Sequence, residues 1–153
     1  MSFQPVLYSE DDENDAFFLK RAFKQAQIPN PLIILPDGQT AIDYCAGVGS
    51  FADRDLHPLP GLVLLDLKMP RKTGMEVLAW LREQPSLSHL PVFILTSSSK
   101  EEDIRRACGY EANGYLVKPS DPEELRSMVQ AIQDYWLQQN RQAIKPWNLL
   151  PSD

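Results

Sequence analysis

Five short apolar runs, each followed by a stretch of helical spacing, constrain the fold of this chain more than any other feature. The apolar runs cover residues 6–8, 32–35, 62–65, 92–95 and 115–117. Apolar side chains then recur at the spacing of a helix in residues 15–27, 38–47, 75–83, 100–108 and from 121 onward. Alternating strands and helices predict an α/β fold, in which helices cover both faces of a doubly wound sheet of five parallel strands.

Two of these segments carry the strongest local signals. The run 62–65 is apolar at every position, which is typical of a central strand buried on both faces. The last helix has a marked start, because Asp121 can cap it, Pro122 fits its first turn and Glu123 suits its positive end. The pattern therefore predicts the sheet centre at 62–65 and a final helix that continues through Trp136.

Length, charge and apolar content narrow the class of protein. The 153 residues and the net charge of −6 fit one acidic domain without a long basic run, which argues against binding to nucleic acid or an anionic membrane. Every apolar stretch is shorter than the roughly 18 residues of a transmembrane helix. Residues 1–5 lack the pattern of a signal peptide, so we expect a cytoplasmic protein.

Two segments interrupt the alternation of strands and helices. We place the domain at residues 1–140, with a long insertion at 48–61 before the third strand and an apolar tail at 141–153. The insertion contains His57, which we expect at the surface. Two interpretations of the tail stay open, since it can fold back over its own domain or reach a second subunit in a symmetric homodimer.

Polar side chains follow four of the five predicted strands. Glu10 and Asp11 come after the first strand, Asp66 after the third, Thr96 after the fourth and Lys118 after the fifth. Because the carboxyl ends of parallel strands meet at one edge of a sheet, we expect these side chains to lie together. The sequence therefore predicts a group of acids beside a hydroxyl and a lysine.

Carboxylates gathered in this way repel one another unless a cation lies among them. Mg²⁺, or Mn²⁺ in its place, prefers oxygen ligands and keeps several waters, so one or two carboxylates suffice to bind it. We predict that Asp11 and Asp66 are direct ligands, that the backbone carbonyl of Lys68 completes the set, and that Glu10 acts through water.

The same edge carries the groups needed to accept a phosphoryl group. The carboxylate of Asp66 can attack phosphorus and form an acyl phosphate. The transferred group spreads its charge over three oxygens and needs positive partners on several sides. The metal ion, the Thr96 hydroxyl with nearby amides, and the Lys118 ammonium each suit one of these oxygens.

This arrangement resembles the response regulator receiver family. The family has an acidic pair after the first strand, a D-x-x-M-P-x-x-x-G block, a T-S step and a K-P step. In this chain these motifs are Glu10-Asp11, residues 66–74, Thr96-Ser97 and Lys118-Pro119. Together they cover roughly residues 4–140, in order and each at a strand end. The resemblance implies a flavodoxin-like (βα)5 fold.

The resemblance also implies a role for each of these residues. Asp66 is the phosphoacceptor, Asp11 is the metal-binding acid, and Lys118 pairs with the phosphoryl group and precedes a cis bond to Pro119. Thr96 is the switch hydroxyl, and Tyr115 is the aromatic residue that turns inward when Thr96 moves. The partners are a sensor histidine kinase and a downstream protein or phosphotransfer protein. Such a receiver assists its own phosphorylation and dephosphorylation but is not an enzyme for a separate metabolite.

Further features narrow the resemblance to one kind of receiver. The insertion at 48–61 and the lack of an output domain resemble the single-domain regulators that partner bacterial, cyanobacterial-type phytochrome kinases, as do residues 37–41 and 66–78. Two positions depart from the family pattern. Ser9 stands where an apolar residue is usual, and Thr73 stands where many relatives have Asp, in the loop that carries the Lys68 carbonyl.

Several alternatives stay open. The chain could be a pseudo-receiver that binds partners without phosphorylation, or a phosphatase of the haloacid dehalogenase type. The phosphatase would need a second acid two residues after the nucleophile, where this chain has Lys68. Thr96 could cap the following helix, although Ser98 or Ser99 can serve as that cap. Tyr115 could simply be a packing residue.

Overall fold

The computed structural model describes residues 3–142, with side chains up to Trp136, and contains the predicted five-stranded parallel sheet. The strands are β1 (Val6–Ser9), β2 (Leu32–Leu35), β3 (Leu62–Leu65), β4 (Val92–Thr96) and β5 (Gly114–Val117). They pair in parallel in the order β2-β1-β3-β4-β5, which is the order of flavodoxin-like folds. The predicted fold class is confirmed.

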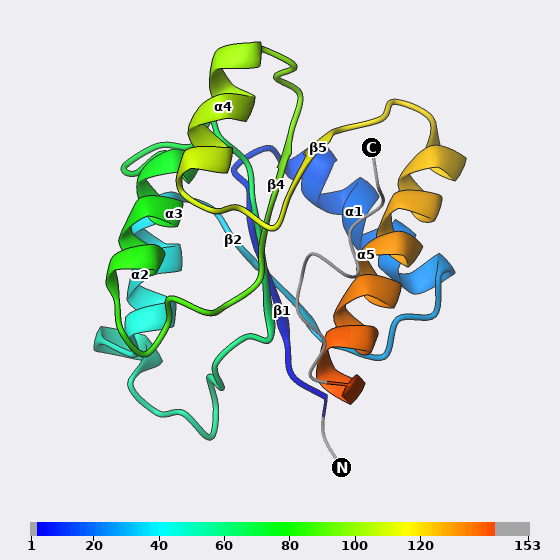
Figure 1. The fold of residues 1–153 in the computed structure, drawn as a ribbon. Helices are drawn as coiled ribbons and strands as arrows, with labels where there is room; N and C mark the ends of the chain where they lie inside the picture. The colour runs from blue at the N-terminus through cyan, green and yellow to red at the C-terminus, as the bar shows by residue number, and fades with distance from the viewer. Residues whose placement is uncertain (1–2, 143–153) are drawn as a thin grey trace.

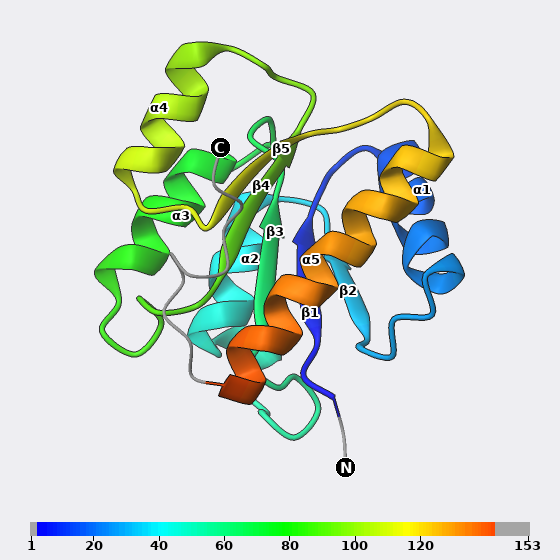
Figure 2. The ribbon, with the colours of Figure 1, turned by 45° about the vertical axis from the view of Figure 1, so that its right-hand side comes forward.

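Five α-helices connect and cover these strands (Figure 1). They are α1 (Glu13–Gln25), α2 (Gly38–Ala46), α3 (Gly74–Glu83), α4 (Glu101–Gly109) and α5 (Pro122–Gln142). Figures 1 and 2 show α1 and α5 on one face of the sheet and α2, α3 and α4 on the other. The sheet is therefore doubly wound.

The first helix begins two residues earlier than the apolar spacing predicts. The Asp12 side chain accepts hydrogen bonds from the amides of Asn14 and Asp15, at 2.8 and 3.0 Å, and so caps a helix that starts at Glu13. This cap satisfies backbone donors that would otherwise lack a partner inside the helix. The earlier start places Asp15 in the first turn, close to the end of β1.

The hydrophobic core consists of two layers, one on each face of the sheet. On β3, Val63 and Leu65 face the layer formed with α2 and α3, whereas Leu62 and Leu64 face the layer formed with α1 and α5. All four side chains are essentially inaccessible to solvent. The apolar run at 62–65 is thus the predicted central strand, and it holds Asp66 rigidly at its carboxyl end.

The insertion at 48–61 is an ordered structure and contains a 3₁₀ turn at Gly49–Phe51. The Arg54 guanidinium donates hydrogen bonds to the carbonyls of Tyr44, Cys45 and His57, at 2.8, 2.8 and 3.0 Å. These bonds hold the insertion against the end of α2. The His57 ring packs against the rings of Tyr44 and Phe51, so this histidine, which we expected at the surface, is only partly exposed.

The last helix continues beyond the predicted end of the domain. We placed that end at residue 140, and α5 extends to Gln142. The rest of the predicted tail, residues 143–153, lies outside the described residues. Among the helices that the structure does describe, none has the length and apolar content needed to cross a membrane.

Candidate functional site

Four of the predicted site residues meet at the carboxyl edge of the sheet. Glu10 follows β1, Asp66 follows β3, Thr96 ends β4 and Lys118 follows β5. Glu10, Asp66 and Thr96 are buried, and the Lys118 side chain is only 13% exposed. The parallel register of β1 with β3 and of β4 with β5 brings these strand ends together.

The Lys118 ammonium lies at the centre of this site. Its Nζ is 2.5 Å from Glu10 Oε1, 2.7 Å from Asp15 Oδ2 and 2.8 Å from Asp66 Oδ2. An ammonium group has three N–H donors, so each of these carboxylates receives one of them. Lys118 therefore links residues from three separate segments of the chain.

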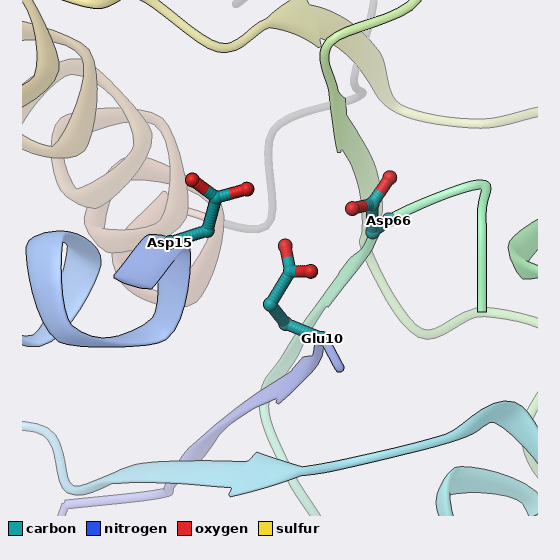
Figure 3. A group of neighbouring side chains, drawn as sticks. All are labelled: Glu10, Asp15 and Asp66. Carbon is teal, nitrogen blue, oxygen red and sulfur yellow. The ribbon is translucent and has the colours of Figure 1, made fainter. Parts of the chain in front are cut away.

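Figure 3 shows three carboxylates that face one another at this edge of the sheet. Glu10, Asp15 and Asp66 each offer an oxygen, and these oxygens all lie within 4.8 Å of one another. Asp15 is a site residue that our sequence interpretation missed, because we placed it only as the start of a helix. The available signal was the capping potential of Asp12, which places Asp15 in the first helical turn.

Two predicted metal ligands are positioned differently from these three acids. Asp11 is exposed and is not one of the carboxylates that converge around Lys118. The Lys68 side chain is also exposed, while its backbone amide lies 3.4 Å from Asp66 Oδ1. The structure thus brings Glu10, Asp66 and Lys118 together and adds Asp15, but it leaves the Asp11 side chain outside this group.

Burial and close charges shift the pKa values of these groups. Burial alone would raise the pKa of Asp66, but hydrogen bonds and the positive charge of Lys118 outweigh it and hold that pKa below its ordinary value. Burial likewise opposes the charged form of Lys118, whereas its bonds to Asp15, Asp66 and Glu10 raise its pKa. Both groups are therefore charged at neutral pH.

Glu10 differs from Asp66 in the direction of its pKa shift. Its burial raises the pKa more strongly than the hydrogen bonds from Lys118, Tyr8 and the Asp12 amide lower it. The net pKa of Glu10 therefore lies above its ordinary value. The carboxylates in this site repel one another, because three acids share one ammonium.

The predicted switch residues lie on neighbouring strands, with Thr96 at the end of β4 and Tyr115 in β5. The fully buried Thr96 accepts a hydrogen bond from the Ser98 amide through its hydroxyl, at 3.3 Å, and from the Lys118 amide through its carbonyl, at 2.7 Å. The half-buried Tyr115 donates its hydroxyl to the Ser98 carbonyl, at 2.8 Å. Ser98 therefore contacts both switch residues.

Two local expectations near these residues are wrong. The residue that caps α4 is Lys100, without a side-chain capping bond, whereas the Ser98 hydroxyl donates to Asp103, at 2.6 Å, and accepts from the Lys100 amide, at 3.3 Å. The bond between Lys118 and Pro119 is trans, since residues 3–142 contain no cis peptide bond. The trans form is the usual one even before proline.

The loop between β3 and α3 explains the glycine of the D-x-x-M-P-x-x-x-G block. A Cβ atom at Gly74 would lie 2.1 Å from the backbone oxygen of Asp66, so only glycine fits there. Thr73 forms a capping box with Glu76 at the start of α3. Its departure from the usual Asp therefore keeps a residue that can cap the helix.

Ser9 also has a structural explanation for its departure from the family pattern. Its buried hydroxyl lies 3.2 Å from the Asp37 carbonyl and 2.8 Å from Met69 Sδ. A serine hydroxyl has a single proton, so it donates to one of these two acceptors at a time. Ser9 thereby joins β1 to the loops that precede α2 and α3.

Comparison with known proteins agrees with this geometry. Residues 6–130 match the family described as the response regulator receiver domain. Response regulator Rcp1 from Synechocystis sp. is 36% identical over 133 residues, which cover 87% of this chain and 88% of Rcp1.

Two solved structures extend the likeness over nearly the whole chain. The phosphorylated cyanobacterial phytochrome response regulator RcpA has a TM-score of 0.82 at 29% identity, covering 99% of this chain and 100% of its own. The Mn²⁺-bound form of Rcp1 has a TM-score of 0.79 at 33% identity, covering 98% and 100%. Since sequence, fold and strand-end residues all agree, this chain belongs to the response regulator receiver family of two-component signalling.

Proposed function

We propose that this protein is a single-domain response regulator that accepts a phosphoryl group from a histidine kinase on Asp66. The observation that carries this proposal is the buried Asp66 carboxylate at the carboxyl end of β3, 2.8 Å from the Lys118 ammonium. The low pKa of Asp66 keeps it ionised, as a nucleophile must be. The Lys118 ammonium is placed to meet an oxygen of the incoming group.

The chemical step forms one bond to phosphorus and breaks another. An oxygen of the Asp66 carboxylate attacks the phosphorus of a phosphohistidine, and the P–N bond breaks as the P–O bond forms. The electron pair of the broken bond stays on the departing imidazole nitrogen. Lys118 and the Thr96 hydroxyl each pair with a phosphoryl oxygen, so the chain assists its own modification and acts on no separate metabolite.

The donor set fits a divalent cation such as Mg²⁺ or Mn²⁺. Glu10, Asp15 and Asp66 present carboxylate oxygens within 4.8 Å of one another, and both metals bind such oxygens. We propose Asp66 as a direct ligand and Glu10 as a ligand through water, and we keep Asp11 and the Lys68 carbonyl in the proposed set. When bound, the cation supplies positive charge to a phosphoryl oxygen.

Thr96 and Tyr115 are the proposed switch. The Thr96 hydroxyl now accepts a bond from the Ser98 amide, while Tyr115 is tied to the Ser98 carbonyl. We propose that the Thr96 hydroxyl moves towards a phosphoryl group on Asp66 and that this movement lengthens the bond from the Ser98 amide. That change releases the segment to which Tyr115 is bonded, and it alters the surface of α4, β5 and α5 that partners read.

We base the proposed cellular role of this chain on its similarity to its relatives. Because RcpA is described as a phytochrome response regulator, we propose that the kinase partner is a bacterial phytochrome and that this chain acts in light signalling in the cytoplasm. The output is then a contact with a downstream protein or phosphotransfer partner. We also propose a homodimer that involves the tail at 141–153.

Mass spectrometry tests the phosphoacceptor directly. Incubation with a small acyl phosphate and Mg²⁺ should add the mass of one phosphoryl group to the wild type and to an Asp55→Asn control in the insertion. The Asp66→Asn variant should remain unmodified, because an amide is not a nucleophile towards phosphorus.

The same measurement has two outcomes that contradict the proposal. Equal labelling of the Asp66→Asn variant moves the phosphorylation site elsewhere in the chain. A wild type that remains unlabelled by acyl phosphates and by every histidine kinase tested is a pseudo-receiver instead.

A further inference from the structure

Tyr8, a buried residue of β1, contacts the candidate site through Glu10. Tyr8 is 1% exposed, and its hydroxyl donates a hydrogen bond to Glu10 Oε1, at 2.7 Å. Its ring packs in the layer of the core between the sheet, α1 and α5. Neither the strand-end pattern nor the receiver motifs point to this residue, because it occupies an ordinary core position of the strand.

The Glu10 carboxylate is held by three donors from different parts of the chain. Tyr8 and Lys118 both donate to Oε1, at 2.7 and 2.5 Å. The Asp12 amide donates to Oε2, at 3.1 Å. A carboxylate has about four lone-pair positions, so these three bonds orient it and still leave room for a metal-bound water.

We propose that Tyr8 is a positioning residue that holds Glu10 in place for the metal ion throughout the phosphorylation cycle. The proposal rests on the proposed function, in which Glu10 serves the metal and Lys118 pairs with the phosphoryl group. All three N–H donors of Lys118 are taken by carboxylates in the present structure. Lys118 must therefore give up at least one carboxylate when it binds a phosphoryl oxygen.

Tyr8, unlike Lys118, does not have to release a carboxylate in order to bind a phosphoryl oxygen. Its hydroxyl has one donor, which Glu10 accepts, and its ring is enclosed by the core and cannot follow Lys118. When Lys118 turns to the phosphoryl group, Tyr8 still occupies Oε1 and the Asp12 amide still occupies Oε2. The Glu10 carboxylate then keeps the orientation in which it would serve a metal ion while Lys118 pairs with the phosphoryl group.

The removal of one hydroxyl group separates this role from simple packing. Tyr8→Phe keeps the ring in the core and deletes the hydrogen bond to Glu10. The matched control is Tyr44→Phe, since Tyr44 is equally buried and donates its hydroxyl to the Pro58 carbonyl, at 2.8 Å, in the other layer of the core. Both variants lose one hydrogen bond of a buried tyrosine, so a purely structural role predicts similar behaviour for both.

Calorimetric titration with Mg²⁺ alone, followed by urea unfolding, provides the test. We expect Tyr8→Phe to weaken Mg²⁺ binding on the order of tenfold, the size of a lost hydrogen bond to a charged group. Tyr44→Phe should bind Mg²⁺ like the wild type. If Tyr8→Phe binds Mg²⁺ as the wild type does and loses only stability, Tyr8 is a core residue and the proposal is wrong.

A double-mutant cycle with Glu10→Gln tests whether Tyr8 acts through Glu10. In the Glu10→Gln background, Tyr8→Phe should change Mg²⁺ affinity little, because the charged acceptor is already absent. Fully additive effects of the two substitutions overturn the proposal. Failure of wild-type phosphorylation at Asp66 is a different result, since it refutes the proposed function while the metal titrations still measure what Tyr8 does.

Discussion

At the scale of single residues, Lys118 contributes most to the candidate site. One ammonium offsets three carboxylates, two of which belong to the buried residues Glu10 and Asp66. In such a site, removing the cation leaves uncompensated charge in a region of low polarity. The lysine therefore stabilises the metal-free fold, in addition to its proposed role of pairing with a phosphoryl oxygen.

Replacing Lys118 with Met should expose this structural function. We expect the free energy of unfolding of the metal-free protein to fall by about 3 kcal/mol, as is typical when one partner of a buried ion pair is removed. Urea unfolding with and without Mg²⁺ measures the effect. Added Mg²⁺ should stabilise Lys118→Met more than the wild type, since the cation replaces the missing positive charge. Equal stabilisation by Mg²⁺ contradicts this account.

The same pair of proteins yields a prediction about pH. The folded pKa of Lys118 lies above its ordinary value of 10.5, so the folded state holds this proton more tightly than the unfolded chain. The stability that Lys118 contributes is then complete below pH 10.5 and is lost as pH rises through the higher, folded pKa. The difference in unfolding free energy between wild type and Lys118→Met should stay constant from neutral pH to about pH 10.5 and shrink above it. A difference that stays unchanged, or grows, as pH rises above 10.5 would show that the folded pKa is not raised.

At the scale of elements, the loop from β3 to α3 connects Asp66 closely to the neighbouring parts of the fold. Its end packs so closely that a Cβ atom on Gly74 would meet the backbone of Asp66, and Met69 Sδ lies 2.8 Å from the Ser9 hydroxyl. A capping box at Thr73 fixes the first turn of the next helix. The backbone of Asp66 is thus confined from the strand side and from the helix side.

Gly74→Ala should disturb this confinement. A Cβ atom 2.1 Å from a backbone oxygen forces the loop to move, and overpacking of this kind costs about 1–3 kcal/mol. Gly109→Ala is the control, because no atom lies within 4 Å of the Cβ position there and Gly109 is helical. We expect Gly74→Ala to lower the melting temperature and slow phosphorylation by acyl phosphate, and Gly109→Ala to do neither. Unimpaired phosphorylation of Gly74→Ala would mean that the loop adapts without moving Asp66.

At the scale of the whole molecule, the polar site residues lie together at the carboxyl edge of the sheet, whereas helices cover its two faces. The carboxyl edge of the sheet holds the acids and Lys118, while Arg54 holds the 48–61 insertion against α2.

The predicted tail contains several apolar residues, among them Ile144 and Trp147. We propose that these apolar side chains contribute to a dimer.

Sedimentation velocity decides this proposal. The full chain should sediment as a dimer, whereas a chain that ends at Asn140 should sediment as a monomer with unchanged circular dichroism. An unchanged oligomeric state after truncation excludes the tail as the dimerising segment. Comparing phosphorylated and unphosphorylated samples then shows whether the assembly depends on Asp66.

Local patterns in the sequence were sufficient for the architecture and for much of the candidate site. Apolar runs and helical spacing predicted all five strands and five helices, because burial on a sheet face or a helix face repeats at a fixed period along the chain. The strand-end rule then brought Glu10, Asp66, Thr96 and Lys118 to one edge, since the ends of parallel strands coincide. These inferences needed no knowledge of distant contacts.

The remaining features depend on how the elements and loops pack in three dimensions. The site includes Asp15 because Lys118, from the far end of the domain, pairs with it, and Glu10 is held by Tyr8 because the core orients that ring. His57 is half-buried because Arg54 folds the insertion onto α2. Periodicity reports which face of an element is buried, but the partner of each polar atom is set by how whole elements pack and how loops close. Those distances exist only once the chain has folded.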